Sequence, residues 1–119
     1  MIAKEFLLPY EVDAAFKEDV QPICQALDAC CHDPELLVRF LRDLLSVKEA
    51  QNLRNRWAIA QLLLQGRSQV EVAKQLRISS KTIGNVYQWV YGPFATGGYA
   101  QVYQSLQQHT DDRSSKQRR

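Results

Sequence analysis

The sequence predicts an all-helical protein organised around a helix-turn-helix. Apolar residues recur three or four positions apart in several successive segments, which is the period of an amphipathic helix. Residues that start and stop helices, such as Ser-x-x-Glu pairs and single glycines, stand between these segments. No segment alternates apolar and polar residues as a strand would. We therefore expect helices joined by short turns, without a sheet.

The first helix of the motif is predicted after Ser68, within residues 68–90, SQVEVAKQLRISSKTIGNVYQWV. Its apolar face consists of Val72, Ala73 and Leu76. Ser68 and Glu71 have the spacing of a capping box, in which each side chain satisfies a free backbone N–H group of the first turn. Ala73 is small where the two helices of such a motif cross, and Ile78 in the turn is expected to fill the gap between them.

The second helix is predicted to begin after Ser79, which is a suitable N-cap. Its buried face is expected to consist of Ile83, Val86, Tyr87 and Val90. Arg77 stands where many such motifs have glycine, because the turn often needs a positive φ; a residue with a side chain costs about 1 kcal/mol there. The alternative to a helix-turn-helix is an ordinary pair of core helices with a tight turn. The caps, the small crossing residue and the turn residue all have the spacing of a helix-turn-helix, which favours the motif.

Charge is distributed unevenly along the chain, although the formal net charge is only +2. Residues 1–35 contain two Lys and eight Asp or Glu, whereas residues 36–119 contain thirteen Lys or Arg and five acids. The basic part also carries the motif, which favours a polyanionic partner.

We therefore predict a surface that binds double-stranded DNA, because a major groove is wide enough to admit the second helix. Its residues are Arg67, Ser68, Gln69, Lys74, Ser79, Ser80, Lys81, Thr82, Gly84 and Asn85. Lys81 and Asn85 are expected to read bases, Arg67 and Lys74 to contact phosphates, and Gly84 to let the backbone approach the duplex. The alternative is a helical protein-interaction and dimerisation module that does not bind DNA.

The remaining chain predicts an arm, three helices before the motif and one after it. Residues 1–11 are expected to be a loose arm, residues 12–108 one helical DNA-binding and dimerisation domain, and residues 109–119 a disordered basic tail without an apolar anchor. Pro22 is a possible kink or break in the first helix. The last helix is expected over residues 99–108.

The helix that follows Asp33 is apolar around most of its circumference, which favours a homodimer. Asp33 is the expected N-cap and Pro34 the first helical residue. The apolar residues are Leu36, Leu37, Phe40, Leu41, Leu44 and Leu45. The next helix is the longest, with a capping box of Ser46 and Glu49 at its start and Gly66 at its end.

Composition and residue spacing argue against several other classes of protein. No apolar run is long enough to span a bilayer, and charged residues and a proline interrupt the N-terminal stretch, so a cytoplasmic protein is expected. Cys24, Cys30 and Cys31 are an odd number without zinc-site spacing, and we expect Cys24 and Cys31 to share one helix face as buried small hydrophobes. Neither histidine has an evident nucleophile beside it, so no catalytic residue, metal or enzymatic activity is predicted.

From about Leu36 to Leu106 the sequence resembles the Trp repressor family, in particular its smaller Trp-repressor-related branch. The likeness rests on LLSVKEAQNLRNRWAIAQLLLQG, on the motif SQVEVAKQLRISSKTIGNVYQWV and on a short last helix. The Leu-Ser-x-x-Glu start and the Arg-to-Gly spacing ahead of the motif make the likeness more specific than the motif alone. It implies a Trp-repressor-like helical bundle, an intertwined homodimer and a sequence-specific transcriptional regulator, in particular a repressor.

The resemblance also implies an effector site between the second helix of the motif and the partner subunit. In the family, a Thr, an Arg and a second Arg form the tryptophan pocket, and by position these match Ser46, Arg56 and Asn85. Asn85 replaces a long cation that would pack on the indole with a short amide. We therefore do not expect tryptophan as co-repressor, and another small-molecule co-repressor stays open; no other cofactor is predicted.

Overall fold

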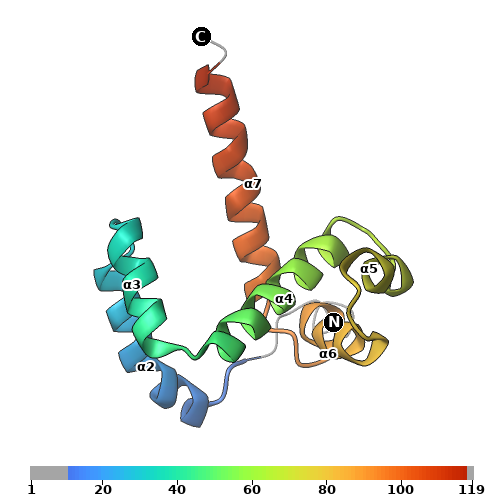
Figure 1. Ribbon diagram of the computed structural model, residues 1–119, viewed down its shortest axis with the longest axis horizontal. Helices are drawn as coiled ribbons and strands as arrows, with labels where there is room; N and C mark the ends of the chain where they lie inside the picture. Colours follow the sequence, from blue (N-terminus) through green and yellow to red (C-terminus); the bar gives the residue numbers. More distant parts are fainter. Residues whose placement is uncertain (1–10, 118–119) are drawn as a thin grey trace, which may run out of the picture. The chain divides into compact units, whose positions relative to one another are not determined.

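A computed structural model describes residues 11–117 of the chain, and their side chains as far as His109. This part of the chain contains helices and no strand, so the predicted all-helical fold is confirmed (Figure 1). The helices are α2 (Ala14–Ala29), α3 (Pro34–Leu44), α4 (Val47–Leu64), α5 (Gln69–Leu76), α6 (Ser80–Tyr91) and α7 (Gly98–Gln117). The predicted N-terminal arm lies outside the described residues, except for Glu11. No helix among the described residues has the length and apolar character needed to cross a membrane.

The described chain divides into two compact units, residues 11–55 and residues 56–117. The division falls within α4, so the first unit holds α2, α3 and the start of α4, and the second holds the rest. The single helical domain expected over residues 12–108 stays a prediction, because these units are defined in one copy of the chain.

Local signals set the helix limits in the first unit. Asp33 accepts a hydrogen bond from the Leu36 N–H (3.1 Å), and Pro34 is the first residue of α3, as predicted. α2 continues through Pro22. This proline lacks the N–H that would bond to the Glu18 carbonyl, so α2 has one hydrogen bond fewer but is not broken.

Almost nothing in the unit of residues 11–55 is buried within one copy. Among the described side chains of this unit only Cys30 is buried, and no residue of α3 is buried. The exposed large apolar residues are Phe16, Ile23, Leu36, Val38, Leu44, Val47 and Leu53. Of the six apolar residues that the sequence assigns to the helix after Asp33, Leu36 and Leu44 are exposed and the other four are half-buried, so one copy covers this surface only in part.

The prediction for the cysteines is wrong, because Cys24 and Cys31 are exposed and Cys30 is buried. α2 ends at Ala29, so Cys31 lies in the turn after the helix and no longer shares the helical face of Cys24. The Cys30 thiol is directed at the carbonyls of Ala26 and Leu27, at 3.4 Å from each.

Both ends of α4 follow the predicted pattern. The Ser46 N–H donates to Glu49 Oε1 (2.9 Å) and the Glu49 N–H donates to Ser46 Oγ (3.1 Å), which is a capping box. At the other end Gly66 has φ 96°, and the N–H groups of Gly66 and Arg67 donate to the carbonyls of Leu63 and Leu62. This is the Schellman arrangement, in which glycine supplies the left-handed residue that closes the helix.

The core of the second unit joins α4, α5 and α6. Its buried residues are Ile59, Ala60, Leu63, Val72, Ile83 and Val86. Trp57 of α4 stacks on Tyr99 of α7 with ring centroids 6.2 Å apart, which attaches the start of α7 to this core. Beyond Tyr103 the described side chains of α7 are exposed, and the helix projects away from α5 and α6 (Figure 1).

α7 is longer than the sequence predicted. We expected the last helix to end at residue 108 and a disordered tail to follow, but α7 continues to Gln117, so the expectation is wrong for residues 109–117. The segment lacks an apolar anchor, which argues against burial but not against a helix; it also contains no Gly or Pro that would stop one. Residues 118–119 lie outside the described part.

Candidate nucleic-acid interface

The first helix of the motif, α5, begins with the predicted capping box. The Ser68 N–H donates to Glu71 Oε1 (3.0 Å), and Ser68 Oγ accepts from the Glu71 N–H (3.2 Å). Hydrogen bonds from the Ser68 backbone and side chain, and to a smaller extent the charge of Arg67, hold the pKa of the Glu71 carboxyl below its ordinary value. The same cause, with Ser46 as donor, lowers the pKa of Glu49. Both carboxylates thus form part of a capping box at the N-terminus of a helix.

The turn between α5 and α6 contains a strained residue at the predicted place. Arg77 has φ 56° and ψ 43°, which is the left-handed region, and it is the one non-glycine residue with positive φ in the part described. Ile78 follows it and packs half-buried against the core, as expected for the residue that fills the gap. Ala73 also packs half-buried against this core. The turn therefore brings α5 and α6 into direct contact (Figure 1).

The second helix, α6, begins at the expected cap. Ser79 Oγ accepts a hydrogen bond from the Thr82 N–H (3.3 Å) and lies 3.0 Å from Thr82 Oγ1. The predicted buried face is confirmed: Ile83 and Val86 are buried, and Tyr87 and Val90 pack half-buried against the core. The opposite face of α6 is left free to meet a ligand.

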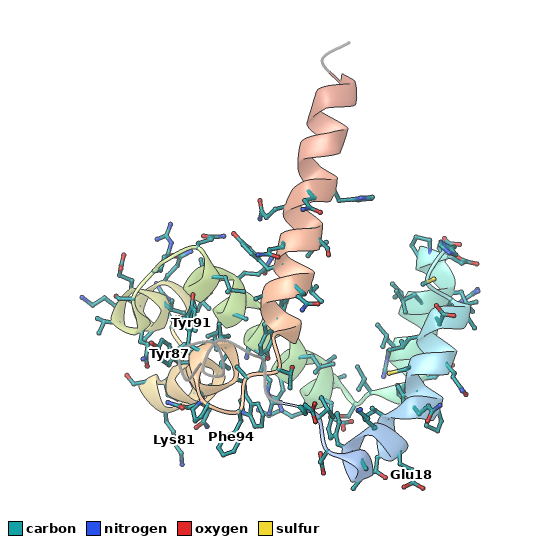
Figure 2. The ribbon with its side chains drawn as sticks, turned by 180° about the vertical axis from the view of Figure 1, so that it is seen from behind. Glu18, Lys81, Tyr87, Tyr91 and Phe94 are labelled. Atoms are coloured by element: carbon teal, nitrogen blue, oxygen red, sulfur yellow. The ribbon has the colours of Figure 1, made fainter. Side chains whose placement is uncertain are left out.

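The residues expected to bind DNA lie at the surface of the motif. Exposed are Arg67, Ser68, Gln69, Lys74, Ser79, Ser80, Lys81 and Asn85; Thr82 and Gly84 are half-buried. Figure 2 shows the Lys81 side chain directed outward from α6. Residues 56–109 contain five Lys or Arg and one acid, Glu71, whose carboxylate is engaged in the capping box. The surface of the motif is therefore basic.

Two of these residues, fifteen positions apart, meet between the helices. A Cβ atom added at Gly84 would lie 3.8 Å from Gln69 Oε1, so the start of α5 lies beside the middle of α6. Gly84 is helical and its φ is not positive, so the backbone conformation does not require glycine there. An alanine methyl group would therefore fit at this position without a clash.

The three candidate effector residues are divided between the two units. Ser46 belongs to the unit of residues 11–55 and caps α4. Arg56 and Asn85 belong to the other unit, and both are exposed. A pocket made of all three stays a prediction. Among the described residues no three His, Cys, Asp or Glu side chains gather as a metal site would require.

Sequence reasoning missed a hydrogen bond that fixes the end of α6. The Tyr91 hydroxyl donates to the Leu63 carbonyl (3.1 Å), across 28 positions of sequence, and the Tyr91 ring lies 5.2 Å from that of Tyr87 (Figure 2). Leu63 also accepts from the Gly66 N–H at the end of α4. No local pattern identifies such a contact, because its donor and acceptor belong to different helices.

The geometry defines an all-helical protein with a capped helix-turn-helix and a basic surface. The family model of the Trp repressor protein matches residues 18–107. This match covers most of the chain, and the chain therefore belongs to the Trp repressor family, as its resemblance implied. The family consists of helix-turn-helix DNA-binding regulators and not of enzymes. Comparison with the curated proteins and with the solved structures gave no match.

Proposed function

We propose that this protein is a homodimeric, cytoplasmic repressor of transcription that binds specific sequences in double-stranded DNA and has no enzymatic activity. The observation that carries the proposal is the outer face of α6. Its buried side is fixed by the core, its start is capped by Ser79, and its polar side is exposed beside cations. A helix held in this way enters a major groove with its first turns nearest the bases.

Within this proposal the polar side chains have separate tasks. Lys81 and Asn85 read base edges, since an amide pairs with adenine and a cation with guanine. Arg67 and Lys74 contact phosphates, where affinity depends on charge and not on sequence. Ser68 and Ser79 are exposed beside these cations, and their hydroxyl oxygens cap α5 and α6, which fixes the helix starts that face the duplex.

The homodimer is supported by the apolar surface of the unit of residues 11–55. Seven large apolar side chains, from Phe16 to Leu53, are exposed there in one copy. So many exposed large apolar side chains in one small unit favour an interface that covers them. The single domain expected over residues 12–108 would then be completed by a second copy. Sedimentation equilibrium at micromolar concentration is expected to show a dimer, and a monomer alone would contradict this part of the proposal.

DNA binding is tested by fluorescence anisotropy on a preferred duplex, first selected from random sequences, and on a random duplex. Lys74→Ala is expected to weaken binding to both alike and to lower the salt slope by about 1. Lys81→Ala and Asn85→Ala are expected to cost about 1–3 kcal/mol on the preferred duplex and much less on the random one. Gln75→Ala, an exposed change on α5 outside the interface, is the matched control.

Equal losses on both duplexes at Lys81 and Asn85 would mean that these side chains position the protein and do not read sequence. A stable dimer that binds neither duplex at low salt would instead identify a protein-interaction module. For the effector, calorimetry with L-tryptophan is expected to show no saturable binding below millimolar concentration, because Asn85 is too short to cover an indole. A micromolar isotherm would contradict that expectation.

A further inference from the structure

An apolar groove lies in the unit of residues 11–55, where the end of α3 meets the start of α4. Its volume is about 490 Å³, which is within the range of sites that hold a ring system. The aliphatic side chains that line it include Val38, Leu41, Leu45, Val47 and Leu53. Val38, Val47 and Leu53 are 66%, 60% and 51% exposed, so no described residue of the same copy covers the groove.

An uncovered indole lies in the other unit. Trp89, near the end of α6, is 57% exposed, and its ring lies 6.5 Å from that of Phe94. Trp89 is the most exposed aromatic side chain among the described residues. Tryptophan is one of the residue types enriched among the side chains that anchor interfaces, because it buries a large rigid surface. The described part of the chain thus has an apolar groove in one unit and an exposed indole in the other.

Charge favours the pairing of these two surfaces across copies. Residues 11–55 contain nine acids and five Lys or Arg, whereas residues 56–109 contain five Lys or Arg and one acid. The acidic unit of one copy therefore attracts the basic unit of another. The groove is also lined by Arg42 and Arg54, and a guanidinium stacks well on an indole face. Arg42 is already held in place, since Nη1 donates to the Leu45 carbonyl (3.2 Å).

We propose that Trp89 of one copy fills the α3–α4 groove of a second copy, and that the exchange is reciprocal. The inference rests on the proposed homodimer and adds the contact that anchors it. Each copy carries one Trp89 side chain and one α3–α4 groove, so the two are always present in equal numbers. The dimer then needs no aromatic ligand at this place, because each copy supplies an indole to the other.

The contact is tested first by photo-cross-linking of the full chain. p-Benzoylphenylalanine replaces Trp89 in ¹⁵N-labelled protein, which is mixed and equilibrated with unlabelled wild type before irradiation. We expect cross-linked peptides that join position 89 of a labelled chain to residues 38–54 of an unlabelled chain. Cross-links of a dimer that reach only residues 1–10, or only the chain's own residues, would overturn the inference and leave the homodimer standing.

A second measurement uses the free indole molecule as a replacement for the side chain. Trp89→Ala is expected to raise the dimer dissociation constant by a factor of about 30, and millimolar indole should restore most of the loss by occupying the vacated groove. Val70→Ala, an equally exposed change on α5, should neither weaken the dimer nor respond to indole. Wild-type protein should show no saturable indole binding, and such binding would mean that the groove is open in the dimer. A wild-type monomer at all concentrations would end both this inference and the proposed homodimer.

Discussion

Replacing Gly84 with Ala separates the stability of α6 from its proposed role on DNA. Gly84 lies inside α6, where glycine costs about 0.5–1 kcal/mol relative to alanine. The added methyl group would meet only Gln69 Oε1, at 3.8 Å, which is ordinary contact and adds no strain. We therefore expect Gly84→Ala to stabilise the fold by about 0.5–1 kcal/mol and to raise Tm by about 2–5 °C at fixed protein concentration.

The same methyl group is expected to harm DNA binding. If the backbone of α6 approaches the duplex at Gly84, the methyl group holds the helix away and loosens every neighbouring contact. We expect at least tenfold weaker binding in fluorescence anisotropy, which is about 1.4 kcal/mol. Gln75→Ala serves as the control and should change neither quantity appreciably. A stabilised variant with unchanged DNA affinity would show that this face of α6 is not at the duplex, and a destabilised variant would refute the packing argument.

Three further predictions concern the supports of the motif. Arg77→Gly is expected to stabilise the fold by up to about 1 kcal/mol in urea unfolding, because glycine relieves the left-handed backbone; Arg77→Ala, which removes the charge but keeps the strain, should not. Tyr91→Phe is expected to cost about 0.5–1.5 kcal/mol through the lost hydrogen bond to Leu63, and an unchanged unfolding midpoint would show that water replaces it. Since the folded pKa values of Glu49 and Glu71 are lowered, their contribution is fully present above the ordinary pKa of 4.5 and is lost as pH falls through the folded values. The double change to Gln should therefore be less stable than wild type at pH 7, and unfolding at pH 3 should show a smaller difference; a constant difference would contradict the assignment.

The start and stop signals of the helices were readable from the sequence because each acts over a few residues. Ser68 with Glu71, Ser79 with Thr82 and the glycine after α4 complete hydrogen bonds within one turn of helix. Such bonds need no tertiary context. The positive φ of Arg77 was expected because the turn of such a motif often needs a left-handed residue at this position.

The tertiary structure alone decided which residues meet across helices and which are buried. The Tyr91 bond to Leu63 and the approach of Gln69 to Gly84 join positions far apart in sequence. The burial of Cys30 in place of Cys24 and Cys31 depended on where α2 ended. The open groove between α3 and α4 likewise depends on where α3 ends and how α4 packs beside it. Apolar periodicity predicts which face of a helix is buried. Which residues bury that face depends on how the other helices, and a second copy of the chain, pack against it.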